Sequence, residues 1–182
     1  MGERAPSFSQ KTPAGDNRPR LVCDACDFVQ YVNPKVVVGS VCTWEDRILL
    51  CRRAIEPRRD HWTIPAGFLE ENETVEDGVR REAWEEARAE LELEGLLGLY
   101  SVPRISQVQL IFRAKLRSPD VTPGEESLEV RLCAWGEIPW DNLAFPSVRW
   151  ALSHYRETRG QATFAVRSNP VGKTGDFPPP RP

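Results

Sequence analysis

The chain has 182 residues, of which 40% are hydrophobic and 28% charged, and its formal net charge is −3. This length is enough for one domain whose core needs no disulfide staples. The small net charge excludes bulk attraction to nucleic acid or a membrane surface, and no stretch is apolar over the ~20 residues of a membrane-spanning helix.

The first 34 residues are predicted to be an extension of the main domain, with residues 1–20 polar, aperiodic and mobile. The start, MGERAPSFSQ, lacks the apolar core of a signal peptide, and five cysteines are an odd count. We therefore expect a cytoplasmic protein with reduced thiols and with no nucleic-acid or membrane partner. Cys23 and Cys26 form a CxxC pair, but structural zinc needs four ligands, and residues 1–22 contain no Cys or His. Zinc is therefore not expected unless Cys23 and Cys26 find partners in another chain.

Alternating signals begin at residue 35. KVVVGSVCTW (35–44) and RILLCRR (47–53) are β-rich and are separated by a two-residue turn, which predicts a hairpin. HWTIPAGF (61–68) is predicted to be a strand that runs into a glycine turn. Thr74 followed by Asp77 resembles a capping box and predicts the start of a helix. One apolar stripe then follows at four-residue spacing: Val75, Val79, Ala83 and Ala87.

Three further strands are predicted at 91–100, 107–116 and 127–135, and a second helix at 146–158. Strands interleaved with two helices indicate an α/β layered domain. The chain ends in FPPPRP, and the tail, 166–182, is predicted to be Pro-rich and disordered. Cys42, Cys51 and Cys133 lie in predicted strands and are expected to be buried thiols. His61 and His154 lack the spacing of metal ligands and are expected to serve structure or to contact the substrate.

The predicted first helix carries an unusual concentration of acid. Residues 67–90 contain eight Glu, one Asp and three Arg, a net charge of −6. Glu82, Glu85 and Glu86 fall within a sector of about 100° on a helical wheel, at the edge of the apolar stripe. Like charges at this spacing, near a helix C-terminus, each cost a few tenths of a kcal/mol or more. Solvated glutamates are the ordinary alternative, but a divalent cation would reverse these costs, and carboxylates are ligands that Mg²⁺ and Mn²⁺ prefer.

The spacing around these glutamates resembles the Nudix box, Gly-x5-Glu-x7-Arg-Glu-U-x-Glu-Glu-x-Gly-U, where U is apolar. Gly67, Glu73 and the run Arg81-Glu82-Ala83-Trp84-Glu85-Glu86 match it, while Arg88 replaces the second glycine. The flanks HWTIPAGFLE, NPKVVVG, LLCRR and ESLEVRL resemble a subgroup that hydrolyses ADP-ribose, FAD and related dinucleotides. The resemblance implies an α/β/α sandwich with a central mixed sheet over residues 35–165 and a homodimer. It also implies that residues 1–34 are an N-terminal extension with half of a zinc ribbon. The first knuckle of the ribbon is missing, and either decay of the ribbon or a misassigned start of the gene would explain this.

By motif position, the resemblance implies that Glu82 and Glu86 are the main metal ligands. Glu85 would be a further ligand, direct or through water, and the backbone carbonyl of Ala66 would complete the shell. Arg81 would pair with a box carboxylate and orient it.

Gly67 would let the backbone turn close to the metal, and Glu73 would buttress the loop or reach a metal through water. A general base is expected from PGEESLEV (123–130). We prefer Glu126, as base and as a further metal ligand, with Glu125 and Glu129 as alternatives.

Substrate contacts are less specific in the sequence. A diphosphate needs cations that can bind it bidentately, and the candidates are Arg52, Arg53, Arg58, Arg59 and Arg104. An adenine ring needs a flat apolar face, and the candidates are Tyr100, Phe112 and Trp62, of which Trp62 suits the core better.

These features predict Mg²⁺-dependent cleavage of the pyrophosphate in ADP-ribose or FAD. NADH is an alternative, although SVPRISQVQLIF (101–112) stands where NADH-hydrolysing relatives show a Ser-Gln-Pro-Trp-Pro-Phe-type motif. A non-catalytic nucleotide-sensing Nudix domain is a second alternative, and RNA-cap hydrolysis a third with weak support. Arg88 is expected to change how the helix ends while leaving the glutamate geometry intact.

Overall fold

The computed structural model describes residues 7–175. The chain divides into two compact units, Met1–Pro34 and Lys35–Pro182, and each is described by itself. Within the described residues, no helix is long and apolar enough to cross a membrane.

The N-terminal unit contains an antiparallel three-stranded sheet in the order β1-β2-β3. Its strands are β1 (Phe8–Lys11), β2 (Arg20–Cys23) and β3 (Val29–Gln30). Asp24 accepts hydrogen bonds from the Ser7 and Ser9 hydroxyls and from Lys11 Nζ, at 3.0, 2.6 and 3.0 Å. The predicted mobility of residues 1–20 is therefore wrong over 7–20, where polar contacts and strand pairing hold the chain, and residues 1–6 lie outside the described part.

The second unit is built on a seven-stranded sheet with the strand order β10-β5-β4-β9-β8, while β6 pairs with β5 and β7 with β4. The strands are β4 (Lys35–Trp44), β5 (Arg47–Arg53), β6 (Trp62–Thr63), β7 (Ala66–Phe68), β8 (Leu91–Val102), β9 (Gln107–Leu116) and β10 (Ser127–Cys133). The β4–β9 pair is parallel and the other strand pairs are antiparallel, so the predicted mixed sheet is confirmed. The stretch predicted as one strand over 61–68 divides in two, because β6 pairs with β5 whereas β7 pairs with β4.

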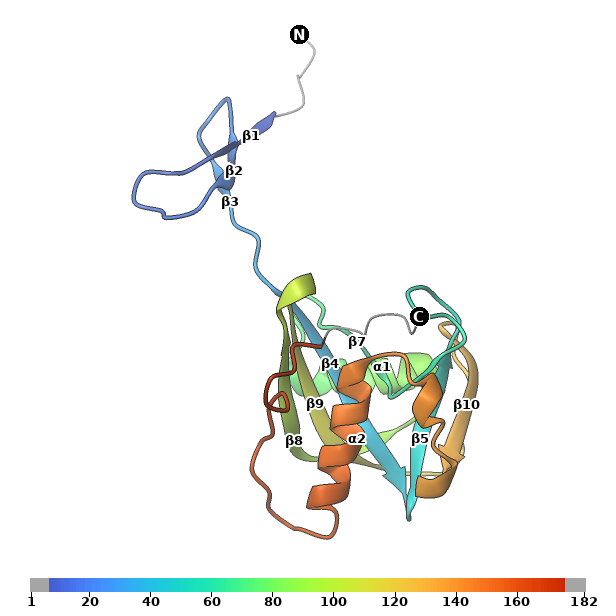
Figure 1. Ribbon diagram of the computed structural model, residues 1–182. Helices are drawn as coiled ribbons and strands as arrows, with labels where there is room; N and C mark the ends of the chain where they lie inside the picture. The colour runs from blue at the N-terminus through green and yellow to red at the C-terminus, as the bar shows by residue number, and fades with distance from the viewer. Residues whose placement is uncertain (1–6, 176–182) are drawn as a thin grey trace, which may run out of the picture. The chain divides into compact units, whose positions relative to one another are not determined.

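Two α-helices cover the sheet, α1 (Val75–Ala87) and α2 (Pro146–Thr158), with short 3₁₀ turns η1 (Pro103–Ile105), η2 (Trp135–Glu137) and η3 (Trp140–Asn142). Alternate strand residues belong to different cores: Val41 packs with the α2 side chains, whereas its neighbour Cys42 packs with those of α1. Because successive strand residues point to opposite faces, the two helices cover opposite faces of the sheet (Figure 1). The predicted α/β class is confirmed.

Candidate active site

Arg81, on α1, is the centre of a network of ion pairs with three glutamates. Its guanidinium donates to both Glu73 carboxylate oxygens at 2.7 and 3.0 Å, and to the Phe68 carbonyl at 2.9 Å. It also donates to Glu82 Oε1 at 2.8 Å and to Glu85 Oε2 at 2.9 Å. The hydrogen bonds from Arg81 to Glu73 lower the pKa of the Glu73 carboxyl to about 2. Arg81 therefore ties the loop before α1 to the carboxylate of the next residue, Glu82, and to that of Glu85 one helical turn further along.

Glu82 and Glu86 are buried on the face of α1 that meets the sheet. A Cβ at position 67 would overlap the Glu82 carboxylate, so glycine lets this carboxylate lie directly against the backbone of β7. Ala66 N–H faces Glu86 Oε2 at 3.4 Å. Burial raises the pKa of Glu82, although Arg81 opposes that shift, and burial together with the neighbouring Glu82 raises the pKa of Glu86 to about 8.

The loop before β10 brings a further carboxylate to this group. Gly124 N–H donates to the Glu86 carbonyl at 3.1 Å, and a Cβ on Gly124 would overlap the Glu85 carbonyl. The loop therefore lies directly against the C-terminal half of α1. Glu126 follows two residues later and contributes to raising the pKa of both Glu82 and Glu86.

The three acids proposed as the base have different surroundings. Among the residues that the structure describes as lining the cavity, Glu126 is present and Glu125 and Glu129 are not. Glu129 instead pairs with Arg52 at 3.3 Å and with Arg131 at 2.6 Å. Glu126 is the acid of the three whose position suits a base.

A cavity of about 750 Å³ extends from these carboxylates, within the range of small-molecule sites. Glu82, Glu85 and Glu126 line it together with Ala66 and Gly67. Much of the remaining wall comes from the β5–β6 loop, from η1 and the start of β9, and from residues 145–148 at the start of α2, with Val102 and Gly175 beside η1.

The candidate arginines separate into two groups. Arg53, Arg58 and Arg104 line the cavity, whereas Arg52 and Arg59 do not. Arg53 Nε donates to the Pro57 carbonyl at 2.9 Å, and its guanidinium lies 5.3 Å from the Phe145 ring centroid.

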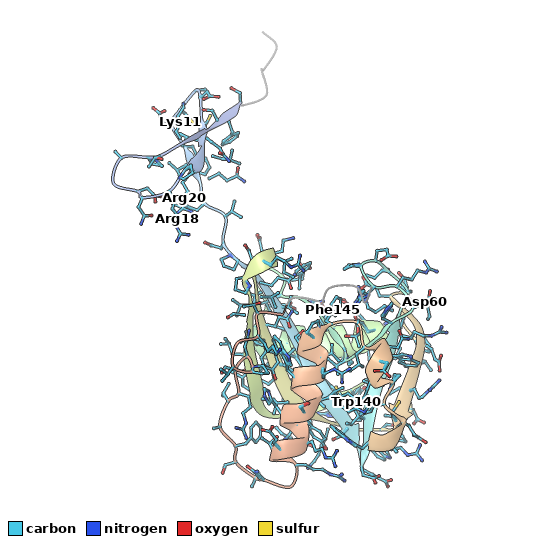
Figure 2. The ribbon with its side chains drawn as sticks, viewed as in Figure 1. Lys11, Arg18, Arg20, Asp60, Trp140 and Phe145 are labelled. Atoms are coloured by element: carbon cyan, nitrogen blue, oxygen red, sulfur yellow. The ribbon has the colours of Figure 1, made fainter. Side chains whose placement is uncertain are left out.

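Arg52 directly precedes Arg53 on β5 and lies on the other face of the strand. It pairs with Asp60, at 3.5 Å, and with Glu129; Figure 2 labels Asp60 in the β5–β6 loop and Phe145 at the start of α2. The assignment of Arg52 to substrate is therefore corrected, because strand alternation turns it away from the cavity.

The aromatic candidates for a nucleobase are corrected as well. Tyr100 is fully buried, with its hydroxyl 2.8 Å from His154 Nδ1 and its ring edge-on to Trp150. Phe112 and Trp62 are also core residues. The rings that line the cavity are Phe68 and Phe145. Phe68 directly follows the glycine of the box, a signal that the sequence reading could have used.

The remaining thiols pack in the two cores, and the other histidine contacts the backbone of the β5–β6 loop. Cys42, Cys51 and Cys133 are buried, as predicted, and burial raises the pKa of each thiol. His61 Nδ1 lies 3.0 Å from the Arg59 carbonyl.

Arg88 ends α1 in the left-handed conformation, with φ 52° and ψ 31°. Its N–H donates to the Trp84 carbonyl at 2.8 Å, and its guanidinium lies 5.7 Å from the Trp84 ring. This is the ending that glycine favours, so no altered ending is seen, and the carboxylates keep their packing on the sheet.

Substituting Arg88 by glycine is expected to leave turnover within about twofold and to raise the free energy of unfolding by up to about 1 kcal/mol. Relief of left-handed strain is partly offset by loss of a cation at the helix C-terminus and of its contact with Trp84. Urea unfolding with a parallel activity assay measures both quantities. A large change in activity would show that the Arg88 side chain shapes the carboxylate site.

The acidic group suits a divalent cation by its chemistry. Within residues 7–175, no three acidic, histidine or cysteine side chains are placed so that they could hold a metal ion. The Glu82, Glu86 and Glu126 carboxylates nonetheless lie close enough to raise the pKa of Glu82 and Glu86. A hard cation would relieve this repulsion, and oxygen ligands are those that Mg²⁺ prefers.

Comparison with known proteins finds family models that match most of the chain. A family model described as NUDIX domain matches residues 33–151, and a zinc-ribbon model described as Nudix N-terminal matches residues 5–32. The crystal structure of a NUDIX hydrolase from Nitrosomonas europaea is 46% identical, covers 93% of this chain and 97% of its own, and superposes with a TM-score of 0.85.

Two curated relatives have more specific names. An ADP-ribose pyrophosphatase of Methanocaldococcus jannaschii is 30% identical, with 63% of this chain and 69% of the relative covered. A NAD-capped RNA hydrolase, NudC, of Photobacterium profundum is 32% identical, with 62% of this chain but only 42% of the relative covered. The chain thus spans less than half the length of the second relative.

Proposed function

The chain belongs to the Nudix hydrolase family, and from this we propose that it cleaves the pyrophosphate bond of a nucleoside diphosphate linked to another group, with Mg²⁺ or Mn²⁺. ADP-ribose and FAD are the preferred substrates. The observation that carries the proposal is the single cavity that joins the Glu82, Glu85 and Glu126 carboxylates to Arg53 and other cations. The name of the Methanocaldococcus jannaschii relative supports ADP-ribose.

In this proposal, Glu82 and Glu86 hold the metal, with Glu85, Glu126 and the backbone of Ala66 as further ligands. The bound ions would neutralise phosphate charge and lower the pKa of bound water. Arg81 positions Glu82 and Glu85, and its pairing with Glu73 keeps it in place.

The remaining roles belong to side chains on the cavity wall. Glu126 accepts the proton of the attacking water, and Arg53 and Arg104 bind the diphosphate oxygens. Phe68 and Phe145 offer the apolar faces that a nucleobase needs. With ADP-ribose, water adds across the P–O–P bridge and the products are AMP and ribose 5-phosphate.

The test is a chromatographic screen of ADP-ribose, FAD, NADH and nucleoside triphosphates, each with Mg²⁺, with Mn²⁺ and with EDTA. We expect metal-dependent AMP formation with the highest kcat/KM for ADP-ribose or FAD. Tight binding of ADP-ribose without turnover would favour the nucleotide-sensing alternative, and turnover confined to nucleoside triphosphates would contradict the proposal.

A second candidate is hydrolysis at an NAD end. It is favoured by the relatives named NAD-capped RNA hydrolase and by the match to the Nudix N-terminal model. NADH and a NAD-capped RNA are therefore included in the screen, and a higher kcat/KM for either than for ADP-ribose would make this candidate the function.

Zinc content tests whether the N-terminal unit binds a metal ion. Cys23 is buried and Cys26 exposed, and these two thiols do not complete a tetrahedral site within the described residues. The match over residues 5–32 nevertheless makes zinc possible. We expect purified protein to contain much less than half a zinc ion per chain by plasma mass spectrometry. One zinc per two chains, lost in Cys26→Ser, would contradict this expectation and indicate a four-thiol site shared with a second copy.

The predicted homodimer and the cytoplasmic location remain predictions. Light scattering behind size-exclusion chromatography tests the first, and cell fractionation the second.

A further inference from the structure

The segment after α2, residues 161–175, follows the outer edge of the sheet, and we name residues 164–175 the C-terminal strap. Figure 1 shows it in red, passing from the end of α2 along β8. β8 is the last strand in the sheet order, so its outer side has no strand partner. The strap was predicted to be part of a disordered tail, but over its described residues it is held at three places.

The first place is Arg113, a buried residue of β9. It donates to the carbonyls of Thr158 and Gln161 at 2.8 and 2.9 Å, and it pairs with Glu94 at 2.8 Å. Its guanidinium stacks 4.1 Å from the Phe164 ring centroid. A buried cation with these contacts fixes where the strap begins.

The second place is the middle of β8. Arg167 N–H donates to the Leu97 carbonyl and Leu99 N–H to the Arg167 carbonyl, each at 2.9 Å. The Asn169 amide then bonds both backbone groups of Ser101, accepting from its N–H at 2.9 Å and donating to its carbonyl at 2.8 Å. Asn169 also donates to the Lys173 carbonyl at 2.9 Å, which folds the strap back on itself.

The third place is the cavity. Gly175 is buried, lies against the Val102 side chain, and lines the cavity beside Val102, Arg104 and Ile105. The strap therefore contributes to a wall of the candidate site.

This wall lies far from the general base. The end of β5 pairs with the start of β10, β4 and β9 start together, and the start of β9 pairs with the end of β8. Glu126 and Val102 thus lie at the same end of the sheet but at its opposite edges, with β5, β4 and β9 between them. At this end β5 pairs with β6 and β4 with β7, so β4 and β5 are not direct neighbours there. Because paired strands alone lie ~4.8 Å apart, the wall is reached by a part of the substrate beyond the diphosphate.

We propose that the C-terminal strap is a substrate-positioning element: by holding β8 through Asn169, it sets the wall formed by Val102, Arg104 and Ile105 against the group linked to the diphosphate. The inference rests on the proposed function, because it assigns that substrate's far end to this wall. Protection of the sheet edge alone would account for the hydrogen bonds, but it predicts no effect on ligand affinity.

The experiment compares wild type with Asn169→Ala and Asn169→Asp. The first removes the three hydrogen bonds, and the second places a carboxylate against two carbonyl oxygens. Val171→Ser is the matched control within the strap, because the Val171 side chain is fully exposed. Hydrogen exchange at the Leu99 and Ser101 amides reports whether the strap is released.

For both Asn169 variants we expect faster hydrogen exchange at these amides. The Kd for ADP-ribose in EDTA and the KM for ADP-ribose with Mg²⁺ should each rise about fivefold to tenfold, while kcat should stay unchanged. The control should match wild type. Kd and KM within twofold of wild type in both variants would overturn the inference. Absence of turnover in wild type would count against the hydrolase proposal alone, since the Kd comparison needs no catalysis.

Discussion

Substituting Glu86 by glutamine is expected to lower kcat/KM for ADP-ribose by about 10³-fold while the protein stays folded. Glu86 is buried beside Glu82, and in the proposed site these two carboxylates hold the metal. A metal ion contributes several kcal/mol to stabilising charge in the transition state, and each ~1.4 kcal/mol is tenfold in rate.

The matched control is Glu76→Gln, an exposed glutamate on the same helix. It removes the same charge from α1 without touching the cavity and should keep wild-type kinetics. Circular dichroism and thermal melting verify that both variants are folded. Equal turnover by Glu86→Gln and wild type would refute the metal assignment.

Substituting Gly124 by alanine is expected to lower both stability and activity, because the added Cβ overlaps a backbone oxygen that cannot move alone. Either α1 or the 123–126 loop must shift, which loses the bond from Gly124 N–H to the Glu86 carbonyl. Overpacking of this kind costs about 1–3 kcal/mol. Displacement of Glu126 should lower kcat by about 10²-fold, the lower range for loss of a general base.

Gly136→Ala provides the control, since a Cβ at that position meets no atom within 4 Å. Urea unfolding and steady-state kinetics are measured on both variants. A stable Gly124→Ala protein with wild-type kcat would show that neither the loop position nor Glu126 matters to the reaction.

The helix that carries the acidic residues was predicted from the sequence because its pattern is local. Glu82, Glu85 and Glu86 lie on one helix, and Thr74 N-caps that helix as predicted, accepting from Asp77 N–H at 3.1 Å. The pairing of Arg81 with a box carboxylate was also predicted. Its bidentate contact with Glu73 required knowing how the loop folds back, although the resemblance had already suggested a buttressing role.

Tyr100 shows where a sequence pattern is insufficient. It lies on a strand covered by α2, and exposure of a strand aromatic depends on which helix covers that face, which a single sequence does not reveal. The prediction for Arg52, the neighbour of Arg53 on β5, was wrong for a related reason. Alternation shows that the two side chains point oppositely, but only the packed structure shows which of them faces the cavity.

Order in the N-terminal unit and in the C-terminal strap was missed because neither depends on apolar periodicity. Asp24 and Asn169 each organise their segment through several polar contacts to residues far away in sequence. Such contacts leave no periodic trace. Residues 176–182, which include the predicted disordered FPPPRP end, lie outside the described part of the chain.

The most direct test of the proposed function is ³¹P NMR of ADP-ribose incubated with the protein and Mg²⁺. We predict that the diphosphate resonances disappear while two monophosphate resonances, of AMP and ribose 5-phosphate, grow in equal amounts, and that EDTA stops the change. Persistence of the diphosphate resonances for ADP-ribose and FAD alike, or cleavage at the same rate in EDTA, would contradict a metal-dependent pyrophosphohydrolase built on Glu82 and Glu86.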